Sequence, residues 1–559
     1  MVYIKELIAL FALIAIVAAN GYKHSYSHYD KDDKWDRHDK HDHHDKHDKH
    51  DHHGKYDKYD HHDKHDHHDK HDHHDKHDHH GKYDKYDKDD KWDKHYKHDK
   101  KHGSDVELHK LCSWNVVEFE KCNLRSDAWH PLKLDAGRNY IPENNVPTGF
   151  AFSQDGRVFV SLARERKGVY ATLAYFHLKD VRDDCCPKLR AYPSDEANSL
   201  DAECCNEGNL VNVKRFTVDR CNRLWAVDKN LLDLNDKNWV LGSPKLVVYN
   251  LGSNKCDREV KIPQEYYTHS AQGLDSVLVH SEPHKPEDAH AYIPDTYNGC
   301  IVVYSYKQNK FWKVCSPEFY SDAKYSKFCL ETRKGKDVTY YRNELVYDCT
   351  LDYKREEAIC HSVSSLDEFT VPLCELESEE TARCSPDSLN VKFLGQKCKD
   401  GQTGTHHLNP KNQVVWGVQE LNHGVACWNR ENKLSPDAVN VVVSCSQRLP
   451  YVADLALTNY DLAPFCKSRK YHKDETYVVV LSNNRASIRA HGFDHKQENF
   501  AFYFFSESEA LECNPQCAPH KHSHHKDSKH YEPSHKSHHD YSRPYSYRYK
   551  KSKESVAEQ

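Results

Sequence analysis

The histidines in the amino-terminal part of this 559-residue sequence are its most conspicuous chemically active side chains. Two dozen histidines lie between His24 and His102, within repeated units of His, Asp, Lys and Tyr. Neutral imidazole is the commonest ligand of zinc and copper, and neighbouring aspartates add oxygen donors. The spacing is irregular, so we expect several plastic zinc or copper sites and no single four-ligand site. The candidate ligands are His43, His44, His52, His53, His67, His68, His73, His74, His79 and His80.

The same repeat can also be interpreted as a solvated spacer. Residues 20–104 contain almost no aliphatic side chains, so they cannot bury enough apolar area to offset the entropy of ordering, and we expect disorder. A shorter His- and Tyr-rich tail, residues 513–559, has the same character. Below about pH 6.5 the histidine tract would become strongly cationic. The tails are therefore predicted to bind metal or aid assembly.

Motifs for familiar enzyme chemistry are absent. There is no G-x-S-x-G elbow, no H-E-x-x-H and no glycine loop for a phosphate or dinucleotide. An isomerase is not excluded, because it needs only one placed acid and one placed base. We expect no required cofactor, and the small formal net charge of -7 gives no reason to expect nucleic acid as a partner.

The first residues predict export. An apolar run over residues 7–17 is too short to span a membrane, and small residues follow it, which is typical of a signal peptide covering residues 1–19. No second apolar run of spanning length follows, so we expect a secreted extracellular protein with no membrane partner. The 21 cysteines fit an oxidising compartment, and their scattered positions favour disulfides over zinc fingers. An odd number leaves at least one cysteine unpaired or bonded to another chain.

Residues 105–512 show the pattern of strand, tight turn and strand, with little helical periodicity. Turns are predicted at Asp155-Gly156, at Cys221-Asn222 and at Lys411-Asn412, each between two apolar runs. Antiparallel clusters repeated over this length favour an all-β fold, a six-bladed β-propeller. A pair of β-sandwiches is the alternative, and periodicity alone does not exclude it.

Several motifs follow one another in the order of a known family. They are Asn145-Val146-Pro147-Thr148-Gly149, Leu189-Arg190-Ala191-Tyr192-Pro193-Ser194, Val218-Asp219-Arg220-Cys221-Asn222-Arg223-Leu224-Trp225-Ala226-Val227-Asp228, Ser243-Pro244-Lys245-Leu246, Ala291-Tyr292-Ile293-Pro294-Asp295, Ala426-Cys427-Trp428-Asn429 and Val480-Leu481-Ser482-Asn483. Together they resemble the Yellow/major royal jelly protein family, whose members are secreted six-bladed propellers. Two positions depart from the family pattern, because Gly242 and the residues before His290 replace usual cysteines.

The resemblance implies a ligand pocket in the propeller. In amine-binding relatives a hydroxyl, an amide and an aromatic ring hold a small aromatic amine, and the matching positions here are Thr405, Glu420 and Asn422. Only the threonine keeps the family's residue type, although a carboxylate at Glu420 could still pair with a cation. The alternative is that residues 419–422 form a solvated loop. Asp228 and Asp295 close their strands and could face the channel, but acceptance of backbone hydrogen bonds in turns is the simpler expectation.

The combined interpretation is a secreted, non-enzymatic propeller of an extracellular matrix, cuticle or secretion. It would bind a small aromatic amine or catechol-type ligand, and its tails would bind transition metals or contact other matrix proteins. The alternatives are an enzyme that converts dopachrome in melanin synthesis and a structural or adhesive secretory protein. A lactonase-type propeller is less well supported, because no set of calcium ligands can be assembled.

Overall fold

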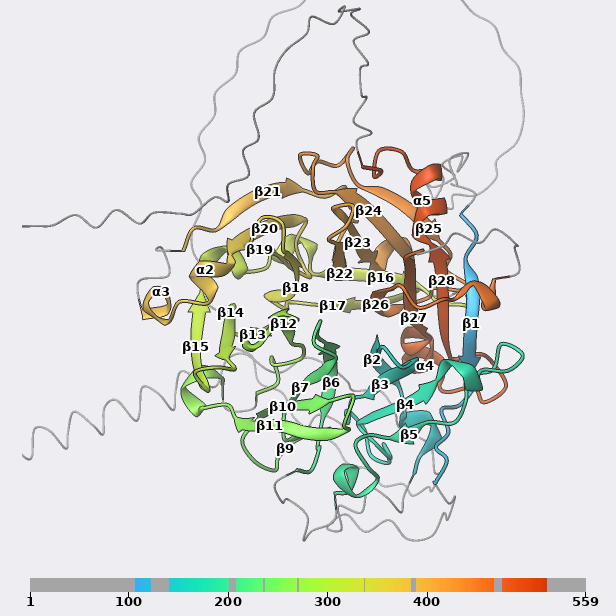
Figure 1. Cartoon of the computed structure of the whole chain (residues 1–559). Helices are drawn as coiled ribbons and strands as arrows, with labels where there is room; N and C mark the ends of the chain where they lie inside the picture. The colour runs from blue at the N-terminus through green and yellow to red at the C-terminus, as the bar shows by residue number, and fades with distance from the viewer. Residues whose placement is uncertain are drawn as a thin grey trace, which may run out of the picture. The chain divides into compact units, whose positions relative to one another are not determined.

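The computed structural model describes residues 106–121, 140–200, 208–234, 237–268, 271–335, 337–383, 389–466 and 475–519. These residues form a ring of six four-stranded antiparallel sheets (Figure 1), which confirms the predicted six-bladed β-propeller. The signal peptide and histidine tract, including all ten candidate metal ligands, lie outside the described residues. The same holds for residues 520–559.

In each blade the strands follow one another in chain order from the centre of the ring outward, except that the outermost strand of blade 6 is β1. Blade 1 consists of β2 (Pro147–Phe152), β3 (Arg157–Leu162), β4 (Leu173–His177) and β5 (Arg190–Ala191). Blade 2 consists of β6 (Val213–Val218), β7 (Arg223–Asp228), β10 (Lys245–Asn250) and β11 (Lys255–Lys261). Blade 3 consists of β12 (Leu278–Glu282), β13 (Lys285–Asp295), β14 (Cys300–Ser305) and β15 (Lys310–Cys315).

The second half of the ring repeats this order. Blade 4 consists of β18 (Val346–Asp352), β19 (Glu357–Ser362), β20 (Asp367–Pro372) and β21 (Lys392–Gln396). Blade 5 consists of β22 (Thr403–Asn409), β23 (Val414–Gln419), β24 (Gly424–Asn429) and β25 (Asn440–Ser444). Blade 6 consists of β26 (Val452–Thr458), β27 (Tyr477–Asn483), β28 (Phe500–Ser506) and β1 (His109–Trp114).

Blade 6 closes the ring by joining the two ends of the folded chain. Its outermost strand, β1, comes from the amino-terminal end and pairs antiparallel with β28, with Trp114 opposite Phe500. This pairing completes blade 6 with a strand from the other end of the folded chain, and closure of this kind protects sheet edges from further pairing. The last described residues extend beyond residue 512, because α5 (Glu507–Cys513) follows β28 and Cys517 forms a disulfide with Cys427.

The predicted hairpin turns have the backbone that their residues favour. Gly156 between β2 and β3 has a φ of +80°, and Asn222 between β6 and β7 has a φ of +58°. Between β22 and β23 the left-handed residue is Gln413, with a φ of +61°, one position after the predicted Lys411-Asn412 pair. Glycine and asparagine tolerate this region best, which is why the first two turns could be located from sequence.

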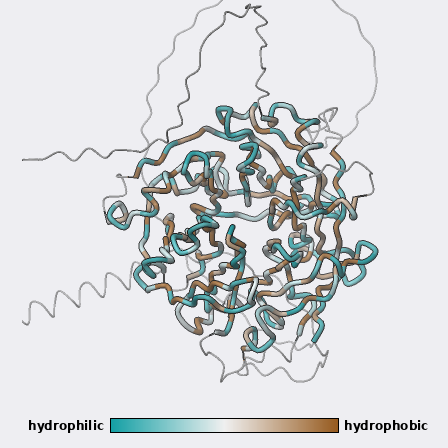
Figure 2. The backbone as a smooth tube through the Cα atoms, in the orientation of Figure 1, coloured by the Kyte–Doolittle hydropathy of each residue, from teal (hydrophilic) through white to brown (hydrophobic). Residues whose placement is uncertain are grey.

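The core lies between the blades. Six hydrophobic clusters each join two neighbouring blades, and large side chains such as Trp225 and Trp416 are fully buried in them. Hydrophobic residues concentrate in the strands, and many loops at the periphery are hydrophilic (Figure 2). The cluster between blades 4 and 5 has only five buried residues, whereas each of the other five has eleven or more.

Smaller elements decorate the ring. The hairpin of β16 (Lys327–Glu331) and β17 (Asp337–Tyr341) precedes blade 4, and that of β8 (Leu231–Leu234) and β9 (Lys237–Val240) interrupts blade 2. The short helices are α2 (Leu373–Leu376), α3 (Glu379–Arg383) and α4 (Arg485–His491). Among the described residues, none of the helices has the length and apolar character needed to cross a bilayer.

The predicted disulfides are present in part. Four bonds link Cys112 to Cys186, Cys300 to Cys315, Cys349 to Cys360 and Cys427 to Cys517. Nine further cysteines of the described residues form no disulfide with another described residue. The bond between Cys112 and Cys186 joins distant segments and holds β1 against blade 1. Such a bond stabilises the fold mainly because it restricts the conformations of the unfolded chain.

Candidate ligand-binding site

Two cavities lie at opposite ends of the central channel, which the innermost strands of the blades surround. The wide cavity, about 660 Å³, is lined by residues near the ends of β2, β6 and β26, including Phe152, Val218 and Thr458. The second cavity, about 280 Å³, is lined by residues near the starts of the same strands, including Thr148 and Lys214. We call the second one the cationic cavity, because cationic side chains dominate its charged lining.

Positive charge dominates the lining of the cationic cavity. Its lining residues are Thr148, Lys214, Arg215, Leu330, Val338, Tyr340, Tyr341, Arg342, Glu344, Tyr347, Tyr451, Ala453, Asn483, Arg485, Ala486 and Arg489. Five of these side chains are cationic, one is acidic and four are tyrosines. The hairpin of β16 and β17 and the helix α4 supply part of this lining, and the hairpin lies across the middle of the ring (Figure 1).

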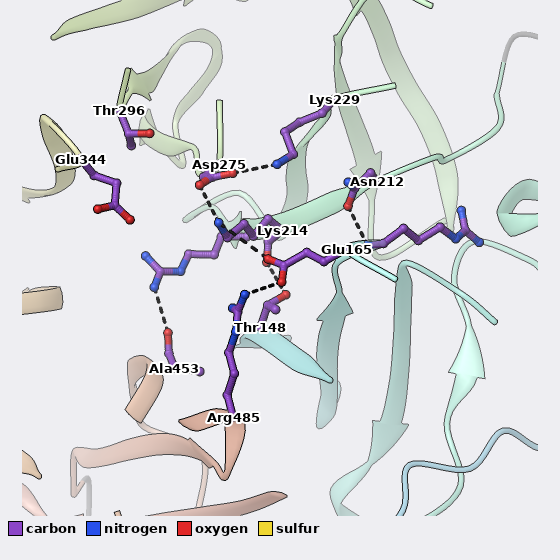
Figure 3. A network of polar contacts seen from close by, with 12 residues as sticks. Thr148, Glu165, Asn212, Lys214, Lys229, Asp275, Thr296, Glu344, Ala453 and Arg485 are labelled. Atoms are coloured by element: carbon purple, nitrogen blue, oxygen red, sulfur yellow. Dashed lines mark hydrogen bonds and ion pairs between the residues drawn. The ribbon is translucent and has the colours of Figure 1, made fainter. Parts of the chain in front are cut away.

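A network of ion pairs fixes the wall formed by blades 1 and 2 (Figure 3). The Lys214 ammonium lies 2.7 Å from a carboxylate oxygen of Asp275 and 4.0 Å from one of Glu165. The Lys229 ammonium lies 2.9 Å from the other oxygen of Asp275, and the Arg485 guanidinium is bound to Glu165. These contacts connect four separate segments of the chain around one end of the channel.

The charges of this wall support one another. Burial alone would raise the pKa of Asp275, but the ammonium groups of Lys214 and Lys229 outweigh it and hold that pKa well below its usual value. Burial likewise opposes the charge of Lys214, and the carboxylates of Asp275 and Glu165 reverse this and raise its pKa. The pKa of Glu165 is also lowered despite burial, mainly by Arg485. Asp275, Lys214 and Glu165 are therefore charged at neutral pH.

Two arginines and a tyrosine form the neighbouring wall. The guanidinium carbons of Arg215 and Arg342 lie 4.9 and 4.8 Å from the ring centroid of Tyr347, within the range of cation–π attraction. Arg215 also donates to the backbone oxygen of Ala453 at 2.9 Å. This wall presents planar cations and an aromatic ring, a combination that suits a flat anionic ligand.

Two groups of the cationic cavity have unused capacity for a ligand. Oε1 of Glu344 accepts from Nε of Arg342 at 3.1 Å, whereas its buried Oε2 has no hydrogen-bond partner in the part of the chain that the structure describes. Arg489 forms no ion pair with any described residue, and the nearby charge of Arg485, followed by burial, lowers its pKa. A carboxylate placed in the cavity would relieve the repulsion between these two arginines.

The structure separates the three residues that the family resemblance selected. Thr405 lies on β22 and lines the wide cavity, and its buried Oγ1 has no hydrogen-bond partner within the described ranges. Glu420 is buried in the short 3-10 helix η8 (Glu420–Asn422), where its carboxylate binds Arg342 and accepts from the Tyr340 hydroxyl at 3.1 Å. Asn422 donates to Gln419 at 2.7 Å. Glu420 and Asn422 line neither cavity, and their ligand role stays a prediction.

The floor of the wide cavity carries two carboxylates, the buried Asp454 and the half-buried Asp348. Asp454 accepts from the backbone nitrogen of Phe150 at 3.0 Å, and burial raises its pKa to about 6, although Arg215 partly offsets this. Asp348 lines the same cavity, and its pKa is lowered despite burial, because the His406 ring donates to it. Two carboxylates with pKa values shifted in opposite directions are typical of sites for proton transfer or for binding a cation.

The strand-end aspartates behave as turn acceptors. Asp228 accepts from the backbone nitrogen of Asn230, two residues further on, at 3.1 Å, and also from those of Val211 at 2.9 Å and Asn212 at 2.8 Å. Asp295 accepts from the backbone nitrogens of Tyr297 and Asn298, both at 3.2 Å. These contacts confirm the simpler of the two expectations.

The comparisons with known proteins decide the family. The sequence model of the major royal jelly protein family matches residues 211–514, more than half of the chain. The protein belongs to the major royal jelly protein family. This confirms the resemblance to the Yellow/major royal jelly proteins that the motifs indicated.

Relatives of this family member have diverse names. L-dopachrome tautomerase yellow-f of Drosophila melanogaster is 27% identical over 376 residues, which cover 66% of this chain and 82% of that protein. Yellow-related salivary protein LJM17 of Lutzomyia longipalpis is 25% identical over 344 residues, covering 60% and 79%. Major royal jelly protein 1 of Apis mellifera is 22% identical over 365 residues, covering 65% and 79%. The family thus includes proteins named as enzymes and proteins that are not.

Proposed function

We propose that the cationic cavity of this major royal jelly family protein binds a flat aromatic ligand that carries a carboxylate. The observation that carries this proposal is the lining of five cationic side chains against one carboxylate, together with four tyrosines. Lys214, Arg342 and Arg485 are paired with carboxylates, whereas Arg215 and Arg489 form no ion pair with a described residue, so an anionic ligand would supply their counter-charge. Guanidinium groups bind a carboxylate well because two parallel hydrogen bonds match its geometry.

The ligand class that we favour is an oxidised catechol ring with a carboxylate, such as dopachrome. One relative is named an L-dopachrome tautomerase and another, from the same organism, a dopaminechrome tautomerase. Tautomerisation removes a proton from one ring carbon and returns a proton elsewhere, so no atom is gained or lost. This reaction needs a placed base and acid and no further cofactor. The proposal therefore favours the enzymatic alternative of the sequence analysis over a purely binding propeller.

Glu344 is the proposed base of this reaction. Arg342 holds one of its carboxylate oxygens, whereas the other is buried at the cavity and has no hydrogen-bond partner among the residues described. An oxygen in this state can accept a proton from a ring carbon held above it. Lys214, Arg485 and Arg489 would bind the ligand's carboxylate and stabilise the negative charge that develops on the ring.

The conversion of L-dopachrome, followed by the loss of its visible absorbance, tests this function. We expect the chain to accelerate the loss, and we expect Glu344→Gln to lower kcat by about 100-fold or more with little change in KM. The control is Glu282→Gln, an exposed carboxylate on β12, and it should behave as the wild type. A rate equal to the uncatalysed one, or full activity in Glu344→Gln, would contradict the assignment.

The wide cavity supports a second candidate function, the binding of a cationic aromatic amine. This cavity is lined by Asp348, Asp454 and Thr405, whose hydroxyl has no hydrogen-bond partner among the described residues. An ammonium group could replace water around these side chains. Thr405→Val should then weaken the binding of serotonin or dopamine, measured by calorimetry, without affecting the binding of a carboxylate ligand.

We further propose that the protein acts outside the cell and that its histidine tract adds zinc or copper binding or assembly with matrix proteins.

A further inference from the structure

We infer that His361, Glu368 and His406 form a binding site for a divalent transition-metal ion, zinc by its donor set, between blades 4 and 5. His361 lies on β19, Glu368 on β20 and His406 on β22. One ligand atom from each lies within 4.8 Å of the others, and all three residues are buried. None of these three residues belongs to the histidine tract of the sequence, and none lines the wide or the cationic cavity.

The two imidazoles are arranged to accept a metal ion. Nε2 of His361 lies 2.8 Å from the backbone oxygen of Gly404, and because a carbonyl oxygen only accepts, Nε2 carries the proton. Nδ1 of His406 lies 3.1 Å from Oδ2 of Asp348 and donates to it in the same way. The free lone pairs are therefore on Nδ1 of His361 and Nε2 of His406. A carbonyl or carboxylate behind each imidazole is the usual second layer of a metal site.

The three atoms that face one another have no hydrogen-bond partner among the described residues. They are Nδ1 of His361, Nε2 of His406 and Oε2 of Glu368. Nε2 of His406 lies 3.8 Å from Oε2 of Glu368, and Nδ1 of His361 lies 3.3 Å from Oε1 of Glu368. Buried polar atoms rarely remain unpartnered, and three that converge on one point call for a common partner. Ligand atoms at about 2.0–2.1 Å from a tetrahedral zinc lie roughly 3.4 Å apart, so small side-chain shifts would suffice.

The site also has space for a fourth ligand of the ion, and nearby carboxylates offset the ion's positive charge. A cavity of about 30 Å³ adjoins Glu368 and His406, which is space for one water molecule as a fourth ligand. Lys397 donates to Oε1 of Glu368 at 2.8 Å and leaves Oε2 free. Its ammonium opposes a nearby cation, whereas the carboxylates of Glu368 and Asp348 favour one. Two imidazoles, one carboxylate and a water are a recurrent zinc donor set.

The position of the site indicates what the ion would do. Blades 4 and 5 share the smallest of the six hydrophobic clusters, with five buried residues. An ion held by β19 and β20 on one side and by β22 on the other would join these two blades where apolar packing is weakest. It would also fix β22, the strand that carries Thr405.

Thermal unfolding of the full chain with and without zinc tests the inference, after metal has been removed with a chelator. The histidine tract can bind zinc in both the folded and the unfolded chain, so it shifts the midpoint little, whereas the blade site exists only in the folded chain. We expect zinc to raise the Tm of the wild type by several degrees. The rise should disappear in His361→Gln and in His406→Gln and persist in the control His177→Gln, a histidine of β4. Equal rises in all four proteins, or no rise in the wild type, would overturn the site.

A second measurement needs no substitution, so it holds even if the histidine variants fail to fold. One equivalent of zinc is added to the metal-free wild type, and X-ray absorption counts the imidazoles around it. Two imidazoles and oxygen ligands are expected, and three or more imidazoles would place the ion elsewhere and overturn the proposal. Lys397→Gln removes the competing ammonium and should tighten zinc binding several-fold. Weaker binding in that variant would contradict the charge argument.

Discussion

The carboxylate of Glu420 is bound to the guanidinium of Arg342, and both side chains are buried. The Tyr340 hydroxyl donates to the other oxygen of Glu420 at 3.1 Å. The family resemblance assigned Glu420 to an amine ligand, but in this structure its charge is already balanced by an arginine of the cationic cavity. The pair thereby ties blade 5 to the hairpin of β16 and β17 and orients Arg342 toward the cavity.

Breaking this pair should be costly. Glu420→Gln leaves the buried Arg342 without its counter-charge, and we expect the free energy of unfolding to fall by about 3–5 kcal/mol. The matched control is Glu431→Gln, whose partner Lys354 lies 2.7 Å away at the exposed surface, with an expected loss of less than about 1 kcal/mol. Urea unfolding measures both. Unchanged stability in Glu420→Gln together with a weaker affinity for serotonin would place Glu420 in an amine site instead.

Acid should weaken the ion pairs of Asp275 with Lys214 and Lys229. Its pKa is lowered in the folded chain from the usual 3.8, so its contribution to stability is complete above that value and is lost as the pH falls below it. We expect Asp275→Asn to be less stable than the wild type at neutral pH, because Lys214 and Lys229 lose their shared partner. The difference between the two proteins should shrink between about pH 5 and pH 2. A constant difference over this range would show that the ion pairs are not its cause.

Metal binding by the histidine tract remains a prediction of the sequence. Deleting residues 22–102 should remove most of the zinc and copper capacity, leaving at most the one ion proposed between blades 4 and 5. Each imidazole must be neutral to bind, so the capacity at about pH 7.5 should collapse at about pH 5.5. Metal titration of the full and shortened chains at both pH values measures this. Equal uptake by the two chains would place the sites in the propeller.

The fold was predictable from sequence because its signals are local. The turns at Gly156 and Asn222 need a left-handed backbone, and the apolar runs beside them give the strand pairs. Ring closure by β1 was not predictable, because Trp114 and Phe500 are far apart in the chain and no local pattern links them.

The functional groups were harder to predict because, like the two strands that close the ring, they come from residues far apart in the chain. Lys214, Glu344 and Arg485 meet at one cavity only after three blades and a hairpin have assembled. The only sequence signal of the proposed zinc site was the adjacent pair His406 and His407, and its partners His361 and Glu368 lie on another blade. Side-chain clusters built from distant strands leave no spacing that a single sequence reveals.

The carboxylate preference of the cationic cavity is the central claim, and calorimetry with a matched pair of stable ligands tests it most directly. Indole-2-carboxylate and tryptamine share a flat bicyclic ring and carry opposite charges. We predict that the full chain binds indole-2-carboxylate at least about 10-fold more tightly than tryptamine. Arg489→Gln removes one of the two lining cations, with Arg215, that form no ion pair among the described residues, and it should abolish most of this preference. Tighter binding of tryptamine, or an unchanged preference in Arg489→Gln, would contradict the account.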